Sequence, residues 1–113
     1  MDCLFCKIAH GSIPANIIYE DTEVLAFHDV APQAPTHILI IPKEHIETIN
    51  NTNDTHQLLL GKLIITAKKL AENLGLSEPG YRLIFNVNKH GGQSVYHIHM
   101  HLLGGRQLTW PPG

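Results

Sequence analysis

Three histidines alternate with apolar residues near the end of the chain: His97, His99 and His101 are separated by Ile98 and Met100. Side chains of a β-strand point alternately to its two faces, so a strand here would carry three imidazoles on one face, about 6.5–7 Å from one to the next. A single histidine on such a strand is usually a satisfied interior residue. Three on one face would each need a partner in the same confined space, which argues against simple core packing.

Two kinds of chemistry fit this triplet. Imidazoles in a His-x-His pattern on a strand can bind zinc. Alternatively, a neutral imidazole is a good nucleophile toward phosphorus when an acceptor on its second nitrogen fixes its tautomer. Neighbouring imidazoles can then donate hydrogen bonds to the developing phosphate charge. The triplet alone leaves both alternatives open.

The rest of the chain predicts the elements that would position these histidines. The longest is a helix over residues 54–73, where apolar side chains at three- and four-residue spacing form one stripe. Asn53 or Thr52 can cap its start, and Gly75 follows its end. A β-branched run over residues 37–41 predicts a central strand covered on both faces.

Shorter patterns complete the predicted fold. We expect a glycine-bearing loop over residues 89–94, a short helix over 3–9, and further strands over 17–19, 24–28, 81–86 and 96–103. This order of elements predicts an α+β fold with a largely antiparallel sheet, one long helix and one or two short helices.

Length and composition narrow the function classes. A chain of 113 residues with 43% hydrophobic and 16% charged residues predicts one globular domain. Its eight Lys and Arg residues are scattered and its formal net charge is -2, so we expect no nucleic-acid partner. No apolar run could span a bilayer, and the start lacks the pattern of a signal peptide, so we expect a cytoplasmic protein without a membrane partner. The pair Cys3 and Cys6 then suggests a metal or a redox pair rather than a structural disulfide.

The surroundings of the triplet resemble a known family. The run from Gly91 to Arg106, which reads GGQSVYHIHMHLLGGR, resembles the histidine-triad (HIT) superfamily in its HINT branch. Further similar segments are AFHDV at 26–30, PQAPTH at 32–37, IIPK at 40–43 and WPPG at 110–113. The resemblance covers nearly the whole chain and implies a single HIT domain over residues 1–113 with the HIT-like fold.

The resemblance implies a hydrolase that acts on P–N bonds, because the branch contains purine nucleoside phosphoramidases. His99 matches the nucleophile, which would form a nucleotidyl-histidine before water releases a nucleoside 5′-monophosphate such as AMP or GMP. His101 matches the residue that contacts the phosphate and the leaving amine, and His97 and His37 match residues that support the site. Catalysis would require no cofactor. The competing function is a nucleotide-binding regulator or scaffold with little catalysis.

The resemblance also implies a binding site for the purine nucleotide, in which Phe27 and Ile18 would wall the base. The other matching positions are His28, Asp29 and Val30 for the nucleoside, and Asn86, Gly92 and Ser94 for the phosphate side, where Ser94 would also assist catalysis. Structural alternatives remain for three of them: Asp29 could cap its loop, Ser94 could be a turn residue, and Asn86 could close the loop to Gly91.

Two further expectations come from the resemblance. Related proteins bind a structural zinc through residues that match Cys3, Cys6, His45 and His97. The alternative is two thiols on a short helix and a solvated imidazole.

The resemblance also implies an assembly, because HINT proteins form two-fold dimers through the long helix and a neighbouring strand. Their C-terminal segment, which here contains Trp110, reaches toward the partner's site. The alternative for Trp110 is a frayed terminus. The remaining histidines are expected at the surface: His10, His56 and His90.

Overall fold

A five-stranded antiparallel sheet forms the centre of the structure, a computed structural model that describes residues 3–113. The strand order is β1-β2-β3-β5-β4. The strands are β1 (Ile17–Glu20), β2 (Val24–His28), β3 (Thr36–Pro42), β4 (Tyr81–Phe85) and β5 (Met100–Gly104). The helices are α1 (Leu4–Ala9), α2 (Gln57–Asn73), α3 (Asn88–Gly91) and two 3-10 turns, η1 (Ile49–Asn51) and η2 (Asp54–His56). The expected α+β fold is confirmed.

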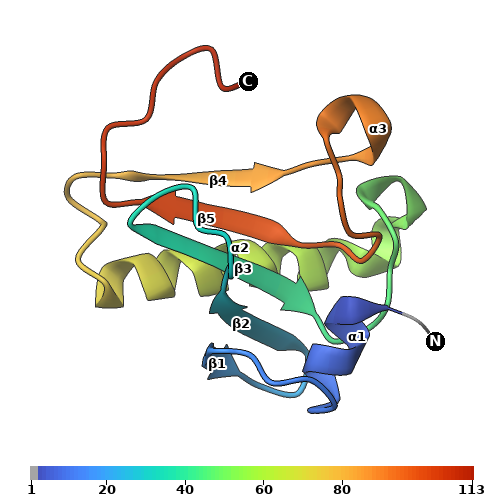
Figure 1. The fold of residues 1–113 in the computed structure, drawn as a ribbon. Helices are drawn as coiled ribbons and strands as arrows, with labels where there is room; N and C mark the ends of the chain where they lie inside the picture. Colours follow the sequence, from blue (N-terminus) through green and yellow to red (C-terminus); the bar gives the residue numbers. More distant parts are fainter. Residues whose placement is uncertain (1–2) are drawn as a thin grey trace.

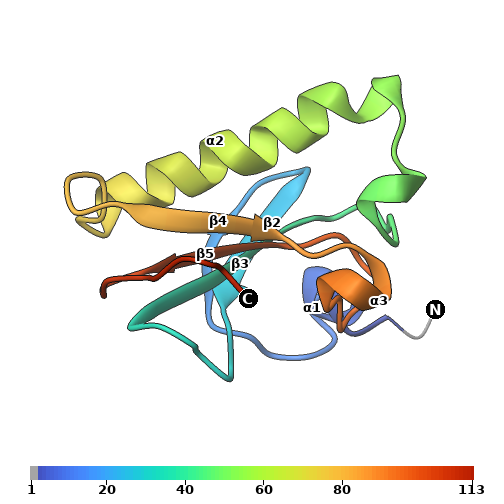
Figure 2. The ribbon, with the colours of Figure 1, turned by 90° about the horizontal axis from the view of Figure 1, so that it is seen from above.

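The two faces of the sheet are covered differently. The long helix α2 lies along one face, and α1 lies on the other (Figures 1 and 2). A large apolar cluster fills the space under α2 and includes Ile98, Met100 and Leu102. A smaller cluster under α1 includes Phe5 and Phe27. The central strand β3 is therefore buried on both faces, as its β-branched run predicted.

Two predicted elements differ from the structure. The last strand begins at Met100, so His97 and His99 precede it; the main-chain nitrogen of Ile98 instead donates to the carbonyl of Ile46 at 2.8 Å. The alternation of faces still holds, because the apolar residues of this segment lie in the cluster under α2. The region predicted as a loop over residues 89–94 contains α3, which ends at Gly92 in the left-handed conformation (φ 77°).

The long helix begins one turn later than predicted. Asn53 caps the short turn η2, which leads directly into α2. Gly75 has a positive φ of 74° just past the helix end, as its position suggested. Within residues 3–113, no helix combines the length and the apolar character that crossing a membrane requires.

Candidate active site and metal centre

The pairing of β3 with β5 brings histidines from distant parts of the chain together. His37 pairs with Leu103, and His101 pairs with Leu39, so the two histidines lie diagonally on one face of the sheet. The rings of His37 and His101 are 5.1 Å apart, and those of His99 and His101 are 5.0 Å apart. The structure thus brings four imidazoles into one row, with His97 at its end.

The tautomer of His99 is set by the main chain. Its Nδ1 lies 2.8 Å from the carbonyl oxygen of His97, which can only accept a hydrogen bond. The proton of the neutral ring is therefore on Nδ1, and Nε2 carries a free lone pair. His99 is buried, with 6% of its surface exposed, and the ring of Phe5 packs edge-on against it at 5.1 Å. A fixed lone pair on a buried neutral imidazole is what a nucleophile at phosphorus requires.

The tautomers of His37 and His101 are set by a main-chain donor. The N–H of Gln33 donates to His37 Nδ1 at 3.0 Å, so the ring proton of His37 is on Nε2. That proton is shared between His101 Nδ1 at 2.8 Å and a carboxylate oxygen of Asp29 at 3.4 Å. Because His101 accepts at Nδ1, its own proton is on Nε2. Among residues 3–113, His101 Nε2 is the one buried side-chain nitrogen or oxygen without a hydrogen-bond partner. Such an unpaired donor marks a functional site.

The protein environment keeps these rings neutral. Burial lowers the pKa of His99 and of His37 below the ordinary value for histidine, and the carboxylate of Asp29 opposes this effect. Burial, together with repulsion from charge on His99 and His37, lowers the pKa of His101 to about 4. At neutral pH each ring therefore offers one donor and one acceptor.

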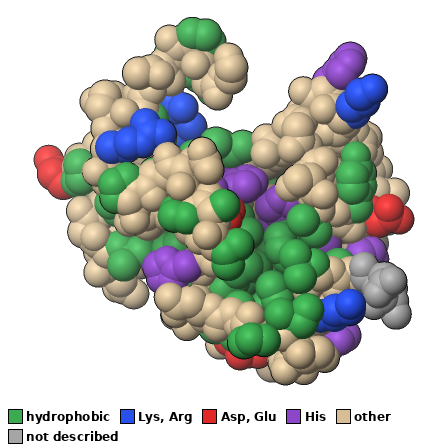
Figure 3. Space-filling model, viewed as in Figure 1, with side chains coloured by type: hydrophobic (Ala, Val, Ile, Leu, Met, Phe, Trp, Pro, Cys, Tyr) green, Lys and Arg blue, Asp and Glu red, His purple; other side chains and the backbone are tan. Residues whose placement is uncertain are grey.

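A cavity of about 670 Å³ lies beside the histidines. His37 and His101 line it together with Asn86, Gly91 and the C-terminal Trp110. Figure 3 shows imidazoles at the surface between the C-terminal segment and α3, next to a patch of apolar side chains. In this single chain, Trp110 therefore lines the cavity of its own histidines, although 82% of its surface is exposed.

The other predicted nucleotide-binding residues lie in two loops. His28 and Asp29 are half-buried at the end of β2, and Val30 is almost fully exposed. One oxygen of Asp29 accepts a hydrogen bond from the main-chain N–H of Ala31, so the loop-capping contact is present. In the second loop, Ser94 and Gly92 are exposed and Asn86 is half-buried. Ile18 packs against the cluster under α2, on the opposite face from the histidines, which contradicts its expected place beside the base.

Two residues near the site were missed by sequence reasoning. Phe5 contacts both His99 and His97, with ring centroids 5.1 and 6.0 Å apart, but on sequence it was only an apolar position of a short helix. Gln93 is buried and uses its amide to accept from Asn88 and to donate to the carbonyls of Glu47 and Val95. Its place inside the GGQS run was the only signal for this role.

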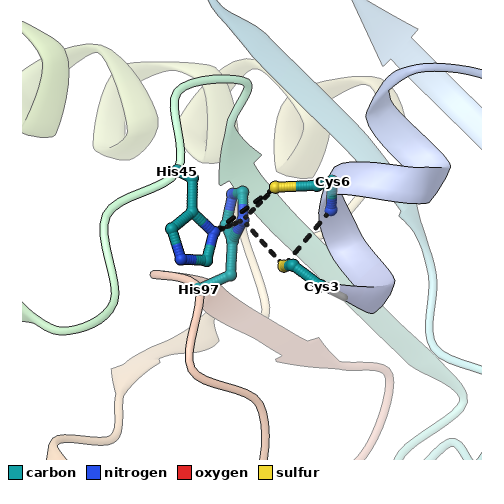
Figure 4. A group of neighbouring side chains, drawn as sticks. All are labelled: Cys3, Cys6, His45 and His97. Carbon is teal, nitrogen blue, oxygen red and sulfur yellow. Dashed lines mark hydrogen bonds between the residues drawn. The ribbon is translucent and has the colours of Figure 1, made fainter. Parts of the chain in front are cut away.

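A second group of side chains meets at His97, the first histidine of the triplet (Figure 4). Cys3 and Cys6 of the α1 region converge with His45 and His97, and their ligand atoms all lie within 4.8 Å of one another. His97 Nε2 donates to the carbonyl of Pro42 at 2.7 Å, so the lone pair of Nδ1 faces this cluster. Cys3 and Cys6 are buried and are not joined by a disulfide.

The distances in this cluster fit a tetrahedral zinc. The sulfur–nitrogen separations are 3.4 Å for Cys3 with His97, 3.6 Å for Cys6 with His97 and 3.3 Å for Cys6 with His45. The two Nδ1 atoms are 3.3 Å apart. In a tetrahedron with zinc–ligand bonds of about 2.3 Å to sulfur and about 2.05 Å to nitrogen, sulfur and nitrogen would be about 3.6 Å apart and the two nitrogens about 3.3 Å apart. The four residues therefore fit a closed structural site.

The cluster of Asp29, His37 and His101 also places three ligand atoms within 4.8 Å, but it does not fit a metal. The N–H of Gln33 occupies His37 Nδ1, so the atom of His37 that faces the cluster carries the proton. A metal needs a lone pair at that atom. These three residues therefore form a hydrogen-bond chain.

Comparisons with known proteins identify the family of the chain. The model of the HIT domain family matches residues 10–108. The purine nucleoside phosphoramidase of Escherichia coli K12 is 56% identical over 107 residues, which cover 95% of this chain and 90% of that protein.

Solved structures are similar over the whole fold. The crystal structure of a HIT family hydrolase from Legionella pneumophila Philadelphia 1 has a TM-score of 0.98 and 67% identity, and the match covers 99% of this chain and 100% of that chain. A histidine triad protein from Clostridium difficile has a TM-score of 0.94 and 42% identity, covering 96% of this chain and 95% of that chain. The family model and these relatives show that the chain belongs to the HIT family.

Proposed function

We propose that the protein is a hydrolase that cleaves the P–N bond of purine nucleoside phosphoramidates and releases a nucleoside 5′-monophosphate. The observation that carries the proposal is the tautomer of His99, whose Nδ1 donates to the carbonyl of His97 and leaves a lone pair on Nε2. The name of the Escherichia coli relative, a purine nucleoside phosphoramidase, supports the same reaction.

The proposed reaction has two steps. In the first, the lone pair of His99 Nε2 forms a bond to phosphorus while the bond from phosphorus to the leaving nitrogen breaks. The unpaired Nε2–H of His101 donates a hydrogen bond to the phosphate, and a water molecule gives the leaving nitrogen its proton, which leaves a hydroxide ion. In the second step, this hydroxide attacks phosphorus, and the nitrogen–phosphorus bond breaks to restore neutral His99. Ser94 and Asn86 are assigned to the phosphate side of this site.

The nucleoside is assigned to the side of His99 where Phe5 and Phe27 pack edge-on against each other at 5.5 Å. His28, Asp29 and Val30 lie at the end of the strand that carries Phe27. The carboxylate of Asp29 would accept from the ribose hydroxyls, as carboxylates commonly do. Apolar walls and one carboxylate suit a purine nucleoside.

The reaction is tested with adenosine 5′-phosphoramidate. We expect turnover by the wild type, and a loss of at least about a thousandfold in the His99→Ala variant, because no other group replaces a covalent nucleophile. His10→Ala is the matched control, since it removes an exposed histidine. Equal rates for wild type and His99→Ala would refute the nucleophile, and nucleotide binding without turnover by either would favour a regulatory binding protein.

We also propose that Cys3, Cys6, His45 and His97 hold one structural zinc ion. The observed tetrahedral spacing supports the ion, which would join the α1 region to the segment that precedes β5. Zinc bound here would supply folding stability and no chemistry at the substrate. Elemental analysis should find about one zinc per chain in the wild type and almost none in Cys6→Ser. A zinc-free wild type with an unchanged melting temperature after addition of zinc would contradict the proposal.

A two-fold dimer is the proposed assembly. The edge strand β4 is unpaired on its outer side in the single chain, and α2 exposes the apolar side chains of Leu58, Ile64 and Ile65. A second copy would cover such a surface. Light scattering after size exclusion should give twice the mass of the chain, and a monomer at micromolar concentration would contradict the dimer.

A further inference from the structure

The loop between β2 and β3 supplies the donor that orders the catalytic imidazoles. The main-chain N–H of Gln33 donates to His37 Nδ1, and His37 Nε2 in turn lies 2.8 Å from His101 Nδ1. Each neutral imidazole has one donor and one acceptor, so this contact, together with the Asp29 carboxylate oxygen 3.4 Å from His37 Nε2, decides every proton position that follows. The end of this hydrogen-bond chain is the unpaired N–H of His101, which the proposed function assigns to the phosphate.

Gly105 and Arg106, which directly follow β5, contact the loop between β2 and β3. Arg106 donates from Nη2 to the carbonyl oxygen of Gln33 at 2.9 Å. Gly105 lies so close to Pro35 that a Cβ on the glycine would be 2.8 Å from Cβ of the proline. Arg106 belongs to the segment that follows the histidine triplet in sequence, so the same stretch of chain carries His101 and the side chain that fixes the loop opposite it.

We propose that Arg106 is a positioning residue that, through Gln33, sets the tautomers of His37 and His101. The inference rests on the proposed function, because it explains how His101 presents a donor to the phosphate. Arg106 touches neither reacting atoms nor the imidazoles; it holds the residue whose N–H contacts His37.

The opposite set of tautomers in this hydrogen-bond chain shows why the contact between Gln33 and His37 matters. If the N–H of Gln33 moved away, the proton of His37 could occupy Nδ1, and His37 Nε2 would become an acceptor. His101 would then donate from Nδ1 and carry a bare lone pair at Nε2. A lone pair repels a phosphate oxygen, whereas an N–H stabilises it. Loss of the Gln33 donor would thus leave the Asp29 carboxylate alone to hold the tautomer that gives His101 its Nε2–H.

The experiment measures the tautomers directly by imidazole ¹⁵N chemical shifts of the full-length protein, without substrate. We expect the wild type to show His37 and His101 with the proton on Nε2. Arg106→Gln and Gln33→Pro, which deletes the N–H, should both shift these rings toward the other tautomer. Gln33→Ala keeps the N–H and should keep the wild-type tautomers, as should Lys68→Gln, which removes a surface cation paired with Glu72.

Turnover provides the second readout. We expect Arg106→Gln to lower kcat about tenfold, which corresponds to the loss of one charge-assisted hydrogen bond, with KM changed less than about twofold. Arg106→Lys should recover part of the loss. Unchanged tautomers in both Arg106→Gln and Gln33→Pro would overturn the inference, even if kcat falls. If the phosphoramidase reaction itself is absent, the ¹⁵N shifts still decide the tautomer question separately.

Discussion

Replacing Gly105 with alanine would be unfavourable for two reasons, its backbone conformation and its close contact with Pro35. The residue has a φ of 94°, a conformation that L-residues rarely adopt, and the new Cβ would lie 2.8 Å from Cβ of Pro35. The backbone conformation costs an alanine about 1–2 kcal/mol, and forcing extra volume into a packed contact costs about 1–3 kcal/mol more. We therefore expect Gly105→Ala to lower the free energy of unfolding by about 2–5 kcal/mol.

Gly75→Ala separates the two contributions. Gly75 has a φ of 74°, but no heavy atom lies within 4 Å of the position where its Cβ would be. This variant should therefore show only the backbone cost of about 1–2 kcal/mol. Both variants are compared by urea unfolding, with the m-value checked for constancy. Equal destabilisation within about 0.5 kcal/mol would refute the close contact between the two loops, because that contact is the only structural difference the reasoning uses.

Other predictions concern the core, the loop before the triplet and the response to acid. Leu63 of α2 is fully buried in the cluster between the helix and the sheet, so Leu63→Ala should lower the free energy of unfolding in chemical denaturation by about 2–5 kcal/mol. Gln93→Leu leaves two carbonyls without donors, and we expect a lower melting temperature together with a lower kcat. The folded protein depresses the pKa of His101 from 6.5 to about 4. This contribution to stability is complete above pH 6.5 and is lost as the pH falls toward 4, so urea midpoints should decline over that range less steeply in His101→Asn than in wild type.

Periodicity and turn residues were sufficient to predict most of the fold. The β-branched run before Pro42 predicted the central strand, and the apolar stripe predicted α2, because both patterns report burial directly. The predicted start of the last strand, Tyr96, was wrong, because β5 begins at Met100 and Ile98 bonds to Ile46 instead of to a neighbouring strand. Such a contact depends on the path of a distant segment, which local pattern does not contain.

The site was predictable in its residue types but not in its proton positions. Spacing placed three imidazoles on one face and singled out the cysteine pair, and the resemblance added His37 and His45. The role of the Gln33 main chain could not be predicted, because a backbone N–H has no sequence signature. The role of Phe5 could not be predicted either, since its contact with His99 arises only when α1 packs on the sheet.

The ring of His97 has two attachments that do not depend on each other. Its Nε2 donates to the carbonyl of Pro42, and its Nδ1, the other ring nitrogen, faces the thiols. Over evolutionary time, a lineage that loses the cysteines would still keep the ring anchored, and with it the carbonyl that orients His99. We therefore expect Cys3, Cys6 and His45 to be gained and lost together among homologues, while His97 persists in lineages of both kinds.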